Sequence, residues 1–248
     1  MDVDVFHVYD RYIFHDEMDF YECYPPAQCL RLTGNAFFTG IGRQGFAFNE
    51  LVSRVNATMM LGMADLKILQ DFGSNVPQSR VHLYTTALMR TESVFMARVY
   101  AIIDGALIAT LDGLGLMVGI KDRKVMKPAE VARRLGLEIN QSPLPSPKRI
   151  QLPSEMQFVR QFPIYYFYCD LNKHMTYSRY ADIVCEAIGY WDQGKHVHMK
   201  HMQIEYAAEA LSGDVLNVYV ANTEQGIYVK GMKESGVISF KAFVEMVD

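Results

Sequence analysis

The sequence predicts an α+β fold built from two consecutive units that share one order of elements. In each half, a strand is followed by a long helix and then by several antiparallel strands. The segments that lead into the two helices, 19–30 and 170–181, align without a gap, and the closing strands, 104–118 and 235–247, are alike. A proline-rich segment separates the two units. Together these observations indicate an internal duplication.

Length and composition restrict the class of protein. Of the 248 residues, 50% are hydrophobic and 21% are charged, as in a well-packed globular protein. The net charge of -4 gives no basic footprint for nucleic acid, and no apolar run approaches the ~20 residues that cross a bilayer. The acidic start does not resemble a secretory signal, and the four cysteines lack the CxxC spacing of a zinc site or a disulfide framework. We therefore expect a cytoplasmic protein with reduced thiols that binds neither nucleic acid nor membrane.

Periodicity assigns the elements of the first half. Residues 5–15 alternate weakly and suit a first strand, and a helix is expected over 27–38, after two prolines. A helical or mixed piece over 49–61 then runs into a strand over 64–69. From Arg80 onward, runs rich in apolar and β-branched residues predict strands.

Turn signals and composition set the expected domain boundaries. Asp104-Gly105 lies between two β-rich runs and is a strong hairpin signal. The chain then becomes basic, with a short helix expected after Pro128, and finally proline-rich. We expect an N-terminal domain over 1–125, a linker over 126–153 and a C-terminal domain over 154–248.

The second half contains an amphipathic helix between predicted strands. An apolar strand is expected over 161–169, and the helix follows with apolar residues at the helical period from Tyr180 to Trp191. Further strands, parted by glycine turns, complete the half. The strand candidates are 201–211, 213–223, 226–233 and 236–247.

Polar residues gather immediately before this helix. Asp170, Asn172 and His174 alternate along a segment that is expected to be extended, which would project their side chains to one side. Because the free N–H groups at a helix N-terminus favour negative charge, a carboxylate, an amide and an imidazole placed there suit a reaction centre. The alternative interpretation is a polar loop that caps a core helix.

Glu209 is a candidate site residue only if its strand face lines a groove. It shares strand parity with Gln203 and Glu205, so periodicity alone places all three side chains on a solvent-exposed face. Its alanine neighbours would leave room for a substrate if that face lay between the two domains.

The three histidines of the HVHMKH motif are candidate metal ligands, but their expected positions on a strand do not favour a metal site. His196 and His198 share a strand face, His201 does not, and no nearby carboxylate completes a ligand set. No metal site is predicted.

Two further groups of residues allow two interpretations each. Met59, Met60 and Met63 suit a core, or the lining of a tunnel for a flexible acyl chain. Basic residues in and near the linker suit a solvated face, or a patch that binds an acidic partner. They are Lys121, Arg123, Lys124, Lys127, Arg133, Arg134, Lys148 and Arg149.

Two motifs resemble those of a known family. Residues 170–175, DLNKHM, are similar to the DxNxHV motif before the second-domain helix of the bacterial and plant acyl-acyl-carrier-protein (acyl-ACP) thioesterases. Residues 204–209, IEYAAE, resemble the (I/L)xYxxE strand of the same family. The resemblance covers nearly the whole chain and is weakest over 20–75. It implies a double hotdog fold, in which two tandem hotdog domains each wrap an antiparallel sheet around a long helix.

The same resemblance implies a reaction, namely hydrolysis of fatty acyl-ACP thioesters to free fatty acid and carrier protein. It implies that Asp170, Asn172, His174 and Glu209 are catalytic, with Glu209 and His174 acting on the attacking water. The partners would be acyl-carrier protein and a fatty acyl chain, with no cofactor beyond the phosphopantetheine that the substrate carries. Ala210 stands where plant members have a cysteine, which favours direct attack by water.

The first half lacks the reactive pair. Tyr21 and Cys23 stand where Asn172 and His174 stand in the second half, so one catalytic site per chain is expected and the N-terminal domain is left to bind the acyl chain. The chain also departs from the family after the histidine, where paired asparagines are common and Thr176-Tyr177 is found here.

Several alternatives stay open at this point. The chain could be a hotdog thioesterase that uses acyl-CoA, a dehydratase of hydroxyacyl thioesters, or a non-catalytic module that binds acyl thioesters. The sequence assigns neither the chain length of the substrate nor the general base, and it is compatible with a monomer or a homodimer.

Overall fold

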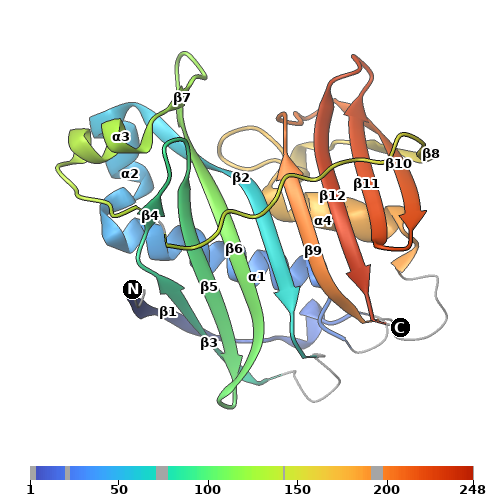
Figure 1. Cartoon of the computed structure of the whole chain (residues 1–248), viewed down its shortest axis with the longest axis horizontal. Helices are drawn as coiled ribbons and strands as arrows, with labels where there is room; N and C mark the ends of the chain where they lie inside the picture. Colours follow the sequence, from blue (N-terminus) through green and yellow to red (C-terminus); the bar gives the residue numbers. More distant parts are fainter. Residues whose placement is uncertain (1–3, 20–22, 71–77, 142, 191–197, 248) are drawn as a thin grey trace.

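The computed structural model describes residues 4–19, 23–70, 78–141, 143–190 and 198–247. A single antiparallel sheet wraps around two helices, α1 (Pro26–Ile41) and α4 (Tyr177–Ala187), which confirms the α+β double hotdog fold (Figure 1). The strand order is β1-β3-β5-β6-β2-β9-β12-β11-β10-β8, with β4 beside β5 and β7 beside β6. The strands are β1 (Val5–Tyr12), β2 (Ala57–Ile68), β3 (Arg80–Thr86), β4 (Met89–Arg90), β5 (Phe95–Ile103), β6 (Ala106–Gly119), β7 (Val125–Met126), β8 (Gln157–Pro163), β9 (Met199–Tyr206), β10 (Val215–Thr223), β11 (Gly226–Lys233) and β12 (Ile238–Met246).

The two halves of the chain meet where β2 pairs with β9. This antiparallel pairing runs from Met63 opposite Glu205 to Lys67 opposite His201. All strands of the first half lie on one side of this pairing and all strands of the second half lie on the other (Figure 1). Because the sheet is continuous, the expected domain boundaries at 125 and 154 stay a prediction.

The central helices pack against each other on one face of the sheet. Gly34 of α1 lies against the ring of Tyr177 at the start of α4, where an added Cβ would stand 2.4 Å from Cε2 of the ring. The Tyr177 hydroxyl donates a hydrogen bond to the carbonyl of Arg31 over 3.1 Å. The absence of a side chain at Gly34 therefore sets how closely the helix of the first half approaches that of the second.

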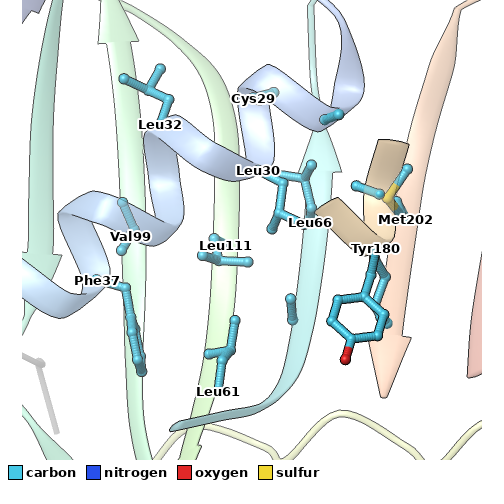
Figure 2. Close-up of a cluster of buried hydrophobic side chains, with 14 of the residues drawn as sticks. Cys29, Leu30, Leu32, Phe37, Leu61, Leu66, Val99, Leu111, Tyr180 and Met202 are labelled. Atoms are coloured by element: carbon cyan, nitrogen blue, oxygen red, sulfur yellow. The ribbon is translucent and has the colours of Figure 1, made fainter. Parts of the chain in front are cut away.

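The core is formed by apolar residues from both halves (Figure 2). Leu30 and Phe37 of α1, Leu66 of β2 and Met202 of β9 are all buried. The apolar stripe predicted for α4 is confirmed at Tyr180, Ile183, Val184 and Ala187, which are buried, whereas Trp191 lies outside the described residues.

Short helical segments complete the fold. The helix predicted after Pro128 is α3 (Pro128–Leu135), which begins at the proline and is capped at its C-terminus by Gly136, a residue with a positive φ. None of the helices in the described part of the chain is long and apolar enough to span a membrane. The remaining segments are η1 (His15–Glu17), η2 (Gly42–Phe46), α2 (Phe48–Glu50), η3 (Leu51–Val55) and η4 (Tyr166–Tyr168).

Some of the predicted elements differ from the structure in their bounds. The helical piece expected over 49–61 ends at Val55, because Asn56 adopts a left-handed conformation and β2 then pairs with β6 from Ala57 onward. The strand expected over 161–169 ends at Pro163, and η4 follows with Tyr166 85% exposed. The hairpin signal is confirmed, since Asp104 and Gly105 both have positive φ.

The linker crosses the face of the sheet opposite to the helices (Figure 1). Midway along, the linker contacts the first half, where Arg90 N–H donates to the carbonyl of Asn140 over 3.0 Å. Further on, Gln203 Nε2 donates to the carbonyl of Lys148 over 2.6 Å, and Ile150 N–H donates to the Glu205 carboxylate. The expectation that Gln203 and Glu205 are exposed is therefore wrong, because the linker covers both side chains.

Candidate active site

The Asp170–His174 segment is a tight turn, and the extended conformation expected for it is wrong. Lys173 N–H donates to the carbonyl of Asp170 over 2.9 Å, and Lys173 has a positive φ of 69°. The Asp170 carboxylate accepts the backbone N–H of Asn172 over 2.7 Å, while Asp170 N–H donates to the carbonyl of His174 over 3.0 Å. The three polar side chains are thus gathered by a turn and not by strand alternation.

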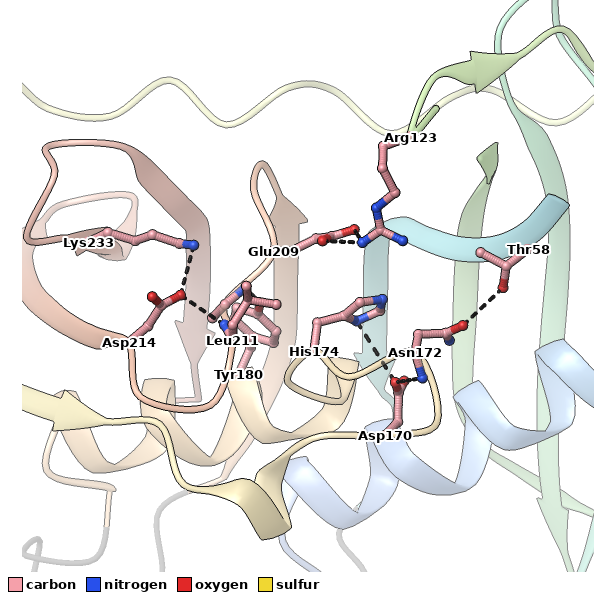
Figure 3. Close-up of polar contacts among 11 residues, drawn as sticks. Thr58, Arg123, Asp170, Asn172, His174, Tyr180, Glu209, Leu211, Asp214 and Lys233 are labelled. Carbon is pink, nitrogen blue, oxygen red and sulfur yellow. Dashed lines mark hydrogen bonds and ion pairs between the residues drawn. The ribbon is translucent and has the colours of Figure 1, made fainter. Parts of the chain in front are cut away.

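His174 presents one ring nitrogen to a carboxylate and the other to a cavity. The residue is 8% exposed, and its Nδ1 lies 4.0 Å from Oδ1 of Asp170, which is beyond hydrogen-bonding distance (Figure 3). Its Nε2 is buried and has no hydrogen-bond partner among the described residues. Because a buried polar atom normally has a partner, Nε2 is suited to bind a water molecule or a substrate in the cavity.

Glu209 does not lie on a strand, and this corrects the parity argument. β9 ends at Tyr206, because the N–H groups of Ala207 and Ala208 both donate to the carbonyl of Ser239, over 2.8 and 3.0 Å. The chain then leaves the sheet and meets the Asp170–His174 turn, where Met175 N–H donates to the carbonyl of Ala210 over 2.8 Å. This pairing brings Glu209 to the same cavity as His174.

Two residues of the first half complete the site, and the sequence did not indicate either role. Thr58 Oγ1 donates a hydrogen bond to Oδ1 of Asn172 over 3.3 Å, and the guanidinium of Arg123 pairs with the Glu209 carboxylate (Figure 3). Arg123 belonged to the basic residues considered for a partner patch, and Thr58 lay in a segment predicted to be helical or mixed. The only available signal was the polar character of Thr58 in an otherwise apolar run.

The cavity has a volume of about 470 Å³, within the usual range for ligand pockets of about 300–1,000 Å³. Its polar end is formed by Arg123, Asp170, Asn172, His174 and Glu209. The second half also contributes Met175, Tyr177, Tyr180 and Tyr206, and most of the remaining apolar side chains come from the first half. They include Phe38, Ile41, Phe46, Leu51, Met59, Met60, Leu61, Leu116 and Val118.

Residues 152–241 match the family model of the acyl-ACP thioesterase C-terminal domain. This segment contains the turn with His174, helix α4 and Glu209. Over these residues, the chain is similar to the C-terminal domain of the acyl-ACP thioesterases. No curated protein matches the sequence.

Solved structures of acyl-ACP thioesterases share the fold over the full chain. An acyl-ACP thioesterase from Bacteroides thetaiotaomicron is 17% identical with a TM-score of 0.78, and each chain covers 98% of the other. A putative oleoyl thioesterase from Lactobacillus plantarum is 12% identical with a TM-score of 0.79, over 99% of this chain and 96% of that one. The 12:0-ACP thioesterase from Umbellularia californica is 13% identical with a TM-score of 0.77, over 98% and 97%.

Asp19 and Cys23, before α1, make the same backbone hydrogen bond as Asp170 and His174, before α4, whereas Tyr21 lies outside the described residues. Asp19 N–H donates to the carbonyl of Cys23 over 2.8 Å, as Asp170 N–H does to that of His174. The Asp19 carboxylate also accepts a backbone N–H, from Cys23 over 2.9 Å. The register of the proposed duplication is therefore confirmed at these positions, with a buried thiol where the second half has an imidazole.

The cysteines and His201 are not among the described residues that line the cavity. Burial raises the pKa of the Cys29 thiol to about 12. His201 Nε2 lies 2.7 Å from the Asp65 carboxylate on the neighbouring strand, and His196 lies outside the described residues. Met59 and Met60 line the cavity, whereas Met63 packs in a separate cluster.

Proposed function

We propose that the chain hydrolyses fatty acyl-ACP thioesters and releases free fatty acid and carrier protein. The observation that carries this proposal is the composition of one cavity, which is polar at one end and apolar at the other. At the polar end, the unpartnered Nε2 of His174 lies among the side chains of Asn172 and Glu209, as an attacking water would require.

We assign proton transfer to His174. Its Nε2 takes a proton from water as the water oxygen bonds to the thioester carbonyl carbon, and Asp170 stabilises the imidazolium that forms. Glu209, whose charge is engaged by Arg123, orients the water by accepting its second proton in a hydrogen bond. When the C–S bond breaks, His174 returns its proton to the sulfur, so that a fatty acid and a free thiol leave.

The amide of Asn172 and the start of α4 are suited to hold the carbonyl oxygen. Because Oδ1 of Asn172 accepts the Thr58 hydroxyl, the NH₂ group is left to donate to the substrate. Thr176 and Tyr177 at the start of α4 line the cavity, and the first N–H groups of a helix have no partner within it. Both groups stabilise the negative charge of the tetrahedral intermediate.

Direct attack by water is supported over an acyl-enzyme. An acyl-enzyme on sulfur would require a cysteine thiol at the cavity. Ala210 occupies the position after Glu209, and no cysteine is among the described residues that line the cavity. No cofactor is required for this reaction, since the phosphopantetheine belongs to the substrate.

The apolar part of the cavity suits the acyl chain. Each buried methylene contributes about 0.8 kcal/mol, so binding energy grows with chain length until the cavity is filled. Most of the apolar lining comes from α1, β2, β6 and the segments between them, with Met175, Tyr180 and Tyr206 added by the second half. This distribution supports a main role of the first half in binding the acyl chain.

Exposed positive charge next to Arg123 in the chain supports an acidic carrier protein as the partner. Lys121, Lys124 and Lys127 are exposed on the turn that carries Arg123 and in the segment that follows it. An acidic carrier that delivers its acyl arm into the cavity would meet these cations first.

A thiol-release assay over a chain-length series of acyl-ACP tests the proposal. Wild type is expected to release thiol, and His174→Ala to lower kcat about 10²- to 10⁴-fold, as for loss of a general base. His201→Ala is the matched control, because that histidine lies outside the cavity. Binding without thiol release would indicate a binding module, dehydration without thiol release a dehydratase, and faster turnover of acyl-CoA a CoA thioesterase.

A further inference from the structure

We propose that Arg123 is a positioning residue for Glu209, supplied to the reaction centre by the first half of the chain. The inference rests on the proposed hydrolase function. It assigns to Arg123 the task of holding the Glu209 carboxylate where it orients the attacking water.

The turn between β6 and β7 fixes the direction of Arg123. Its backbone has a positive φ of 56°, and its N–H donates to the carbonyl of Gly119 over 3.0 Å. Gly119 N–H donates to the carbonyl of Lys124 over 2.9 Å, and a Cβ at Gly119 would stand 2.2 Å from the Asp122 carboxylate. The turn is therefore closely packed, and it presents the Arg123 side chain toward the second half (Figure 3).

The ion pair connects the turn between β6 and β7 with the segment that follows β9. One nitrogen of Arg123, Nη2, contacts both carboxylate oxygens of Glu209. Arg123 is also the only lysine or arginine among the described residues that line the cavity. Glu209 follows the end of β9, so its side chain needs a partner of this kind to keep one orientation.

The solvent exposure of the Arg123–Glu209 pair favours a role in positioning the carboxylate over a role in stabilising the fold. The side chains of Arg123 and Glu209 are 44% and 29% exposed, and ion pairs this close to water contribute little to folding. Loss of the pair should therefore leave thermal unfolding nearly unchanged while it displaces the carboxylate. Displacement of a reacting group by about 1 Å can lower a rate about 100-fold.

The test compares Arg123→Ala and Arg123→Lys with wild type, with and without Glu209→Gln. Hydrolysis is followed with acyl-ACP and with a short acyl-pantetheine thioester. We expect Arg123→Ala to lower kcat about 10- to 100-fold on both substrates with KM within about twofold, and Arg123→Lys to recover part of the loss. In the Glu209→Gln background, Arg123→Ala should cause no further loss, because no carboxylate is left to position.

Arg160→Ala is the matched control, because Arg160 and Glu186 form a similarly exposed pair (53% and 48%) away from the cavity. If Arg123→Ala lowered kcat as much in the Glu209→Gln background as in wild type, the inference would be overturned. A rise in kcat on Arg123→Ala would also overturn it, because the ion pair would then inhibit the reaction. A rise in KM for acyl-ACP alone would make Arg123 a docking residue and also overturn it. If wild type released no thiol, the proposed function would fail and this inference with it, whereas an active wild type with an unaffected Arg123→Ala variant would refute the positioning role alone.

Discussion

The hydroxyl of Thr58 donates a hydrogen bond to Oδ1 of Asn172 over 3.3 Å, and this contact joins the first half of the chain to the candidate active site. Thr58 lies on β2 and is almost completely buried, so its side chain is fixed by the sheet. The bond selects one orientation of the Asn172 amide, with the NH₂ group facing the substrate position.

Replacement of Thr58 by valine should therefore reduce turnover. Valine keeps the shape but removes the donor, and the loss of about 1 kcal/mol of hydrogen bonding corresponds to roughly a fivefold lower kcat. Thr58→Ser retains the hydroxyl and should retain most of the activity. Steady-state thiol release checks both variants, and equal losses in them would contradict the proposed role of the hydroxyl.

Gly34→Ala should destabilise the fold. The new Cβ would lie 2.4 Å from the Tyr177 ring, and overpacking of this kind costs about 1–3 kcal/mol. Guanidinium unfolding measures the change in the free energy of unfolding. In a background with Tyr177→Ala the same substitution should cost much less, because the ring that it strikes is gone. Equal costs in the two backgrounds would rule out this clash as the cause.

Asp10 should make stability depend on pH below 4. A hydrogen bond from His7, with further contributions from His82 and Arg80, lowers the pKa of the Asp10 carboxyl from 3.8 to about 2. Because the folded-state pKa is the lower one, the stabilisation is present above pH 3.8 and is lost as pH falls toward 2.

Chemical unfolding of wild type and Asp10→Asn at a series of pH values checks this dependence. The difference between their free energies of unfolding should narrow between pH 3.8 and 2. A difference that stayed constant through this window would show that the ionised carboxylate contributes nothing.

Charge reversal at the lysines beside Arg123 should affect the carrier-bound substrate selectively. Lys121→Glu with Lys124→Glu is expected to raise KM for acyl-ACP several-fold, because rim charges act mainly on association. A short acyl-pantetheine thioester, which carries no protein, should be hydrolysed as by wild type. An equal loss on both substrates would place the effect in the catalytic site instead, and a wild-type KM for acyl-ACP would exclude the patch.

Much of the fold could be predicted because its signals are local and periodic. The stripe from Tyr180 to Ala187 and the Asp104-Gly105 turn each fix a conformation within a few residues. The start of β2 was missed, because Asn56 ends the preceding helix and only pairing with β6 reveals the strand that follows. The burial of Glu205 was missed for the same kind of reason, since the linker that covers it is more than fifty residues away in the chain.

The candidate site was likewise predictable where a local motif exists and was missed where only contacts between distant segments define it. Resemblance to the family identified Asp170, Asn172, His174 and Glu209, and the structure brings them around one cavity. The reason given for Glu209 was incomplete, because strand parity ends where β9 leaves the sheet. Thr58 and Arg123 have no pattern of their own, and only the folded chain shows which residues they contact.

The backbone hydrogen bond that Asp19 has in common with Asp170 has a consequence for how such a chain can change. In a pair of identical subunits, every substitution appears twice, so a residue that improves one pocket is also imposed on its twin. Here the two copies are fused, and Arg123 meets Glu209 once while the position that matches His174 holds Cys23. Each half can therefore accumulate substitutions independently, and selection can act on the two halves separately.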